Sequence, residues 1–167
     1  MKSNICFVSL NNTFTKSVAN LFASYTDMYF ADIEELMQFD LIDVANAMDI
    51  CGIEYIKKIE HSKIKNVCTY DNTCVSVNYE MLNDEINCNA LKEHCTTIMI
   101  DFSLDTFKCM QPKQYDKINK NNIDLDLFHS RRKILKSNVD IVVHYMPSDK
   151  NLNKKIITKL MDYYKKK

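Results

Sequence analysis

The sequence predicts a three-layer α/β/α fold, in which helices cover both faces of a central parallel sheet of about five strands. Short apolar runs of strand length alternate along the chain with segments whose apolar residues recur at helical spacing. That alternation is typical of a parallel sheet with helices on both faces. The chain has 167 residues, of which 46% are hydrophobic, and no repeat or linker is visible. We therefore expect one domain over residues 1–167.

The elements expected in the first half of the chain follow from the spacing of apolar residues. Apolar runs predict strands at 5–8 and 28–30, and one or two short strands within 67–77. Helical spacing predicts helices at 18–25, 41–48 and 53–61. Within 67–77 the turn residues Asp71 and Asn72 are ordinary turn formers.

The second half of the chain continues the same alternation. Helices are expected at 81–92, from about Ser103, at 123–137 and after Pro147, and strands at 96–102 and 139–145. Residues 111–122 are polar and have no sustained period, which predicts a mobile loop or lid. The helix at 123–137 carries Arg131 and Arg132, the only arginines of the protein.

The composition disfavours several classes of function. Lys plus Arg and Asp plus Glu each number 22, so the net charge is zero and neither nucleic acid nor a membrane surface is an expected partner. The seven cysteines form no C-x-x-C pair, and the four histidines have no metal-ligand spacing. We therefore expect buried, reduced thiols and no metal site in a cytoplasmic protein without a membrane-spanning segment.

The polar turn after the strand at 5–8 is the first candidate site. In a nucleotide-binding α/β protein such a turn has the form G-x-x-x-x-G-K-[ST], whose glycines let backbone N–H groups wrap the phosphates. Lys16 and Ser17 could bind a nucleotide cofactor there, but Leu10 and Thr15 occupy the glycine positions. The only glycine of the chain is Gly52. The turn therefore has the place of a phosphate loop without its chemistry.

Carboxylates follow the expected strand at 28–30. Open α/β sheets bind ligands at the carboxyl ends of their strands, which makes Asp32 a candidate catalytic residue. The alternative is structural: Asp32 caps a helix whose first turn is stabilised by Glu34 and Glu35.

From Asn4 to Leu160 the chain resembles the shikimate kinases, which are small P-loop kinases. The loop region matches that family in length up to Phe30, and three further segments resemble its motifs in the same order. FADIEEL at 30–36 is similar to F-x-D-x-D-E-L, GIEYIKKIE at 52–60 to G-E-x-x-F-R-x-x-E, and RRKILKSNVD at 131–140 to R-x-P-L-Y-x-E-x-A-D. The resemblance implies a P-loop kinase fold with ATP, Mg²⁺ and shikimate as ligands.

The resemblance also implies roles for single residues at the phosphate loop and the first carboxylates. Aligned without a gap, Thr15 replaces the phosphate-binding lysine and Lys16 replaces the magnesium-binding hydroxyl, whereas a slip by one residue restores Lys16 and Ser17 to these roles. Asp32 matches the base-like, magnesium-linked Asp, and Glu34 replaces the Asp that holds the substrate hydroxyls.

Further matches concern the substrate carboxylate and the lid. Lys57 replaces one carboxylate-binding arginine, and Arg131 matches the second. Residues 71–73 stand in for a G-G-G turn that approaches the substrate, and the lid motif R-P-L-L is reduced to QPKQ at 111–114. The bulky Leu10 and Phe14 would fill the place of a triphosphate.

Three interpretations follow. The first is a kinase fold that has lost its activity and needs no cofactor, a pseudoenzyme that binds a protein partner or a small anionic ligand, for instance within aromatic amino-acid biosynthesis. The second is a divergent ATP-dependent shikimate kinase that uses Lys16, Ser17, Asp32 and Arg131. The third is an unrelated α/β domain with a different strand order.

Overall fold

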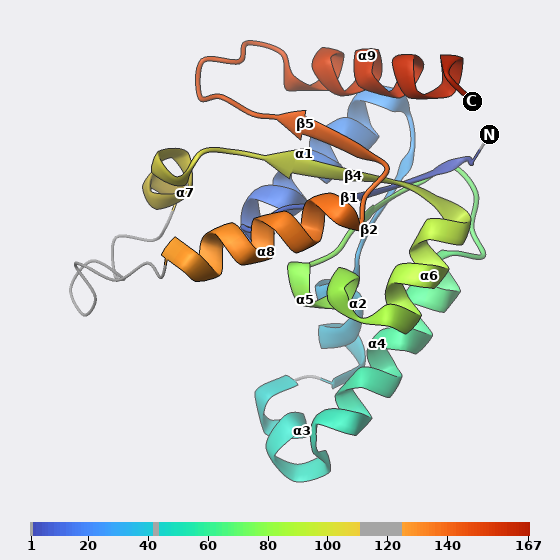
Figure 1. The fold of residues 1–167 in the computed structure, drawn as a ribbon. Coiled ribbons are helices and arrows are strands. Elements are labelled where there is room, and N and C mark those ends of the chain that lie inside the picture. Colours follow the sequence, from blue (N-terminus) through green and yellow to red (C-terminus); the bar gives the residue numbers. More distant parts are fainter. Residues whose placement is uncertain (1, 42–43, 111–124) are drawn as a thin grey trace.

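A computed structural model describes residues 2–41, 44–110 and 125–167. Its centre is a five-stranded sheet in the order β2-β3-β1-β4-β5, in which every neighbouring pair is parallel (Figure 1). The strands are β1 (Asn4–Val8), β2 (Tyr29–Asp32), β3 (Thr73–Ser76), β4 (Cys95–Asp101) and β5 (Ile141–His144). The predicted five-stranded parallel sheet is confirmed.

Helices cover both faces of this sheet, as Figure 1 shows. Before β3 they are α1 (Asn12–Thr26), α2 (Ile33–Leu41), α3 (Val44–Cys51) and α4 (Ile53–Val67). After β3 they are α5 (Tyr79–Asn83), α6 (Glu85–His94), α7 (Leu104–Met110), α8 (Leu125–Ser137) and α9 (Leu152–Lys165).

A hydrophobic cluster lies between the sheet and the helices on each of its two faces. On one face Ile5 and Phe7 of β1 pack with Val18 and Phe22 of α1 and with Ile156 of α9. On the other face the cluster joins β1 to α2, α4, α6 and α8 through residues such as Cys6, Val8, Ile33, Ile64, Leu91 and Leu135. Because successive side chains of a strand point to opposite faces, a sheet that is covered twice needs unbroken apolar strands. This requirement explains the apolar runs in the sequence.

Several element boundaries differ from the expectation. The helix expected at 41–48 corresponds to α3, which runs from Val44 to Cys51, and α2 precedes it. α4 continues past the expected end at 61 to Val67. The helix expected at 81–92 is divided, because Asp84 accepts hydrogen bonds from the N–H groups of Ile86 (3.1 Å) and Asn87 (3.2 Å) and so begins α6. A side-chain cap of this kind can divide a helix although the spacing of its apolar residues is unchanged. The apolar spacing alone therefore predicted one helix.

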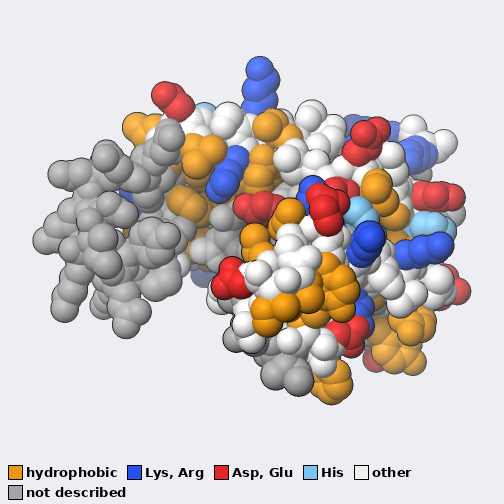
Figure 2. Space-filling view, turned by 90° about the horizontal axis from the view of Figure 1, so that it is seen from below, with side chains coloured by type: hydrophobic (Ala, Val, Ile, Leu, Met, Phe, Trp, Pro, Cys, Tyr) orange, Lys and Arg blue, Asp and Glu red, His pale blue; other side chains and the backbone are white. Residues whose placement is uncertain are grey.

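The surface carries charges of both signs, and Figure 2 shows them interspersed with exposed hydrophobic side chains. Five large hydrophobic residues of α2, α3 and α4 are exposed: Phe39, Met48, Ile50, Ile53 and Tyr55. None of the helices within the described ranges is both long and apolar enough to cross a membrane.

Candidate functional site

The candidate site lies at the carboxyl ends of β2, β3 and β1, which are adjacent in the sheet. Asp32 is the last residue of β2, Ser9 follows β1, and Asn78 lies two residues after the end of β3. The connections that leave these strands therefore meet at one edge of the sheet, as expected for a ligand site in an open parallel sheet.

The turn between β1 and α1 is short and closed by its own hydrogen bonds. α1 begins at Asn12, so only residues 9–11 separate it from β1. Asn11 caps the helix, because its side-chain oxygen accepts a hydrogen bond of 2.9 Å from the Phe14 N–H, and its carbonyl accepts one of 2.9 Å from the Thr15 N–H. The Thr15 side chain is fully buried, with its hydroxyl 2.7 Å from that of Ser9.

Lys16 and Ser17, the predicted cofactor-binding residues, point to different partners. Lys16 forms an ion pair with Glu35 of α2. This hydrogen bond, with smaller contributions from the carboxylates of Asp32 and Glu34, raises the pKa of Lys16. The Ser17 hydroxyl donates to the Thr13 carbonyl within α1 (2.9 Å). The structure thus places Lys16 among carboxylates and Ser17 against its own helix.

Asp32 and Glu34 are both engaged by neighbouring groups. The buried Asp32 carboxylate accepts a hydrogen bond of 2.9 Å from the Glu35 N–H, which confirms that Asp32 caps α2. Glu34 accepts hydrogen bonds from the side-chain amides of Asn12 (3.2 Å) and Asn78 (2.9 Å). Through these hydrogen bonds Glu34 joins the segments of chain that follow β1, β2 and β3. The catalytic role of Asp32 and the substrate-binding role of Glu34 stay predictions.

Arg131 and Lys57, the predicted carboxylate-binding pair, lie on α8 and α4. Arg131 of α8 lies over the ring of Tyr79, 5.3 Å from its centroid, and 3.9 Å from a carboxylate oxygen of Glu80. Arg131 is thus held beside the segment that follows β3. Lys57 is exposed on α4 and, within the described residues, makes no hydrogen bond or ion pair with Asp32 or with Arg131.

The expectation that residues 71–73 face the ligand is wrong. Because α4 continues to Val67, this turn connects α4 to β3 at the amino end of the sheet. There the Ser3 hydroxyl donates to Asp71 (2.8 Å), and the Asn4 side chain donates to the Tyr70 carbonyl (2.6 Å). The residues that follow β3 at the carboxyl end of the sheet are instead 77–80, which include Asn78 and Tyr79.

Phe14 packs beyond the turn against two other aromatic side chains. Its ring centroid lies 4.8 Å from that of Tyr145 and 5.9 Å from that of Phe102. Leu10 packs against the core cluster on the other face of the sheet. Side chains of the chain itself therefore occupy both sides of the turn.

Sequence reasoning missed a cluster around Asp101 at the end of β4. Arg132 binds this buried carboxylate through two nitrogens (2.5 and 2.7 Å), and Lys136 (2.8 Å) and His144 (2.9 Å) also contact it. Burial raises the pKa of Asp101, but Arg132 and Lys136 more than offset this and hold it below its usual value. The sequence feature that could have indicated this cluster is the position of Asp101 directly after the apolar residues 98–100. Asp101, Arg132 and His144 of this cluster line a cleft of about 630 Å³ together with Phe102, Phe128 and Tyr145.

Two expectations concern cysteines and metals. All seven cysteines are free, and five are buried, whereas Cys51 and Cys109 are exposed, contrary to the expectation of buried thiols throughout. Within the described ranges no group of three or more His, Cys, Asp or Glu side chains could hold a metal ion. The predicted lid at 111–122, with its QPKQ motif, lies outside the described residues.

Comparison with known proteins gives a consistent result. No family profile matches the chain. A shikimate kinase from Aquifex aeolicus (strain VF5) is 24% identical over 148 residues, which cover 86% of this chain and 88% of that protein.

Solved structures agree with this similarity. The crystal structure of shikimate kinase from Aquifex aeolicus has a TM-score of 0.80 at 22% identity, covering 96% of this chain and 98% of the other. Shikimate kinase from Acinetobacter baumannii, in complex with shikimate, has a TM-score of 0.71 at 11% identity, covering 99% and 94%. The chain is therefore a shikimate kinase homologue in sequence along most of its length, and it has the shikimate kinase fold.

Proposed function

We propose that this protein is a shikimate kinase-like pseudoenzyme of the cytoplasm, which binds a ligand or partner without transferring phosphate. The observation that carries the proposal is the turn between β1 and α1. A phosphate loop presents free backbone N–H groups to the anion. Here the N–H of Phe14 is bonded to the Asn11 side chain and that of Thr15 to the Asn11 carbonyl. The loop is degraded into the first turn of a helix.

The charges at the turn also fit Mg²⁺ and ATP poorly. In the alignment without a gap, the phosphate-binding lysine is replaced by Thr15, whose side chain is buried against Ser9. Lys16 then takes the position of the magnesium-binding hydroxyl and pairs with Glu35. An ammonium group beside these carboxylates competes with a metal ion for the same negative charge.

The arginines support the same conclusion. An arginine that stabilises the transition state is worth ~10³ to 10⁵ in rate in other phosphoryl-transfer enzymes. Arg131 and Arg132 are the only arginines of this protein. Arg131 lies over Tyr79, and Arg132 is bound through two nitrogens to Asp101. Both arginines are therefore bound to other groups, and neither takes the role of the lid arginine.

A binding role fits the remaining features. Arg131 near Tyr79 provides one cation for a small anionic ligand at the site. The exposed hydrophobic residues of α2, α3 and α4 are the kind of surface that protein partners cover. The resemblance to shikimate kinases makes an enzyme of aromatic amino-acid biosynthesis the first partner to test.

The alternative is a divergent ATP-dependent shikimate kinase. It is supported by one observation, since Lys16 lies near the carboxylates of Asp32, Glu34 and Glu35 at the carboxyl end of the sheet. In that case Lys16 and Ser17 would bind the nucleotide, Asp32 would act as the base, and Glu34, Lys57 and Arg131 would hold the substrate.

Thermal unfolding with and without ligands separates the two functions. The purified protein is melted alone and with millimolar ATP, ADP, Mg²⁺ and shikimate, singly and combined. A ligand at 100 times its Kd adds ~2.7 kcal/mol, which shifts the midpoint of a domain of this size by several degrees. We expect no shift with any nucleotide, and a shift with shikimate alone would indicate a retained anion site.

A shift with Mg-ATP would contradict the proposal. The variant Lys16→Met then tests the alternative, because it removes the only cation of the turn while leaving the buried Thr15 in place. Loss of the shift in this variant, together with turnover of shikimate by the unmodified protein, would establish a divergent kinase.

A further inference from the structure

β2 is an edge strand, because in the described part of the chain it pairs only with β3. The N–H of Tyr29 donates to the Asn72 carbonyl, on the side of β3. Successive peptide groups of a strand point alternately toward and away from a neighbouring strand. The Met28 carbonyl, both backbone groups of Phe30 and the Asp32 N–H therefore point away from β3. None of them has a hydrogen-bond partner within the described residues, so β2 presents an open backbone edge.

An apolar groove of about 510 Å³ lies beside this edge. Tyr29 and Ala31 of β2 line it, together with Leu36 of α2 and Val67 at the end of α4. Because alternate side chains of a strand share a face, Tyr29 and Ala31 lie on the same side of the sheet. The Tyr29 side chain is 75% exposed. A strand that paired with β2 would place every second side chain over the groove.

The amino end of the groove is acidic. Asp71 lines the groove, and its carboxylate accepts a hydrogen bond of 2.8 Å from the neutral Ser3 hydroxyl. Asp27 lies at the same end, because its carbonyl accepts a hydrogen bond of 3.1 Å from the Asn72 side chain. Both side chains are exposed, and neither pairs with a cation within the described residues. A bound segment would therefore gain from a basic residue at this end.

We propose that the edge of β2 binds an extended segment of a partner protein, which adds a strand to the sheet, places alternate apolar side chains in the groove and sets a Lys or Arg beside Asp71. In binding of this kind the backbone hydrogen bonds give affinity, and the pockets for alternate side chains give specificity.

The charge of the edge favours such a partner over a second copy of this chain. Residues 17–56, which include β2, carry several Asp and Glu and no Lys or Arg. Pairing of β2 with β2 of another copy would therefore bring like charges together. The proposal also does not depend on the proposed loss of kinase activity, because it uses the side of the sheet and not the turn between β1 and α1.

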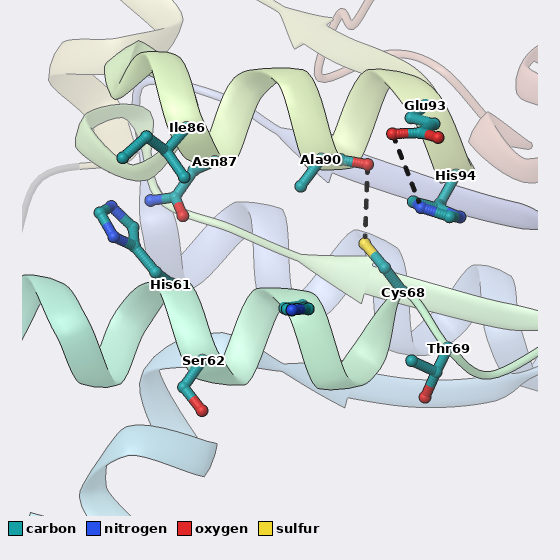
Figure 3. Close-up of a pocket in the computed structure, with 10 residues that line it drawn as sticks. His61, Ser62, Cys68, Thr69, Ile86, Asn87, Ala90, Glu93 and His94 are labelled. Carbon is teal, nitrogen blue, oxygen red and sulfur yellow. Dashed lines mark hydrogen bonds and ion pairs between the residues drawn. The ribbon is translucent and has the colours of Figure 1, made fainter.

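A second groove, of about 500 Å³, provides a matched control surface. It lies between α4 and α6 (Figure 3). Its walls are helices, whose backbone groups bond within the helix and offer no strand edge. Ile86 lines this groove and is 62% exposed. A substitution of Ile86 should therefore leave the binding of a strand unchanged.

The binding test uses the full-length protein and a fluorescein-labelled peptide in which valine and threonine alternate between a lysine at each end. Fluorescence anisotropy measures binding, and we expect it to be saturable. The same peptide with glutamates in place of the lysines should bind more weakly. A peptide with proline at its central position should lose most of its binding, because it lacks an N–H group there.

Amide hydrogen exchange, followed by NMR, locates the bound peptide. In the free protein the N–H groups of Tyr29 and Ala31 point toward β3, whereas those of Phe30 and Asp32 are open. We expect the lysine peptide to slow exchange at Phe30 and Asp32 and to leave Tyr29 and Ala31 nearly unchanged. This alternation is specific to a strand that pairs with the edge, because a peptide that only covered the groove would not produce it.

Three variants test the contribution of each feature. Ala31→Lys places a long cationic side chain in the groove and should abolish saturable binding. Asp71→Asn should weaken binding of the lysine peptide about two- to five-fold, as is usual for an exposed charge pair. Ile86→Lys, in the groove of Figure 3, should bind as the natural protein does. If Ala31→Lys does not melt cooperatively, Tyr29→Ala at its exposed position replaces it and should weaken binding.

The proposal is overturned if the lysine peptide does not bind, if exchange at Phe30 and Asp32 is unchanged at saturation, or if Ile86→Lys weakens binding as much as Ala31→Lys does. Light scattering after size-exclusion chromatography tests the second copy. A dimer that Ala31→Lys converts to a monomer would show that another copy covers β2, which also overturns the proposal. None of these measurements includes a nucleotide or shikimate, so their outcome is independent of thermal unfolding with those ligands.

Discussion

The hydroxyl oxygens of Ser9 and Thr15 lie 2.7 Å apart in the buried turn between β1 and α1. Both hydroxyls also lie within hydrogen-bond distance of the Asn11 carbonyl, Ser9 at 3.0 Å and Thr15 at 3.1 Å, so two hydroxyl protons serve these three contacts. A nucleotide-binding turn would direct a lysine outward from this region, whereas here two neutral side chains close the turn from inside. The local stability of the turn should therefore depend on them.

The first prediction concerns Thr15→Val, which keeps the shape of the side chain and removes its hydroxyl. We expect a loss of about 1 kcal/mol in the free energy of unfolding, because the contact between the two hydroxyls is lost while Ser9 keeps its hydrogen bonds with Asn11. Urea unfolding measures this loss. Ser17→Ala is the control, since the Ser17 hydroxyl is exposed and bonds only within its own helix; an equal loss in both variants would contradict the role of the buried pair.

The second prediction concerns Phe14→Ala. The half-buried Phe14 ring contacts Phe102 and Tyr145, and its removal should cost about 2 kcal/mol of stability through lost apolar contacts and an unfilled space. Phe39→Ala is the matched control, because Phe39 is 89% exposed and its truncation should change stability little. A loss of stability no larger than that of the control would show that Phe14 does not fill the site.

The third prediction concerns Asp101→Asn. Asp101 is only 1% exposed and is contacted by Arg132, Lys136 and His144, so the neutral amide would leave these groups without their counter-charge. We expect a loss of about 1 to 2 kcal/mol at pH 7, because the side chains of Arg132, Lys136 and His144 are 29%, 36% and 65% exposed and water replaces part of the lost interaction. Asp105→Asn, an exposed substitution in α7, should cost far less in the same denaturation experiment.

The fourth prediction is the pH dependence of the same group. The pKa of Asp101 is lower in the folded protein than the value of about 3.9 in an unfolded chain. A lowered pKa contributes stability that is fully present above pH ~4 and is lost as the pH falls through the folded value. The difference in unfolding free energy between the natural protein and Asp101→Asn should therefore be constant from pH 7 to about 5 and shrink below about 4. A difference that grew on acidification would refute the assignment.

Part of the candidate site could be predicted from the sequence because it depends on local order along the chain. Asp32 follows an apolar run and precedes a helix, so its cap was one of two stated interpretations, and the hydrogen bond to Glu35 confirms it. The turn after β1 was placed correctly for the same reason. The misplacement of residues 71–73 has a local cause as well, since nothing in the apolar spacing marked Val67 as the end of α4 rather than the start of a strand.

The sequence by itself determined the parallel α/β fold, because strands buried on both faces require unbroken apolar runs and the helices between them require helical spacing. It also determined that no glycine-rich phosphate loop exists, since the chain has a single glycine. Only the tertiary structure decided which side chains meet. Arg132 lies 31 residues from Asp101, and Asn78 lies 44 residues from Glu34. Such contacts depend on how elements that are distant along the chain pack against each other. The spacing of residues in the sequence does not predict this packing.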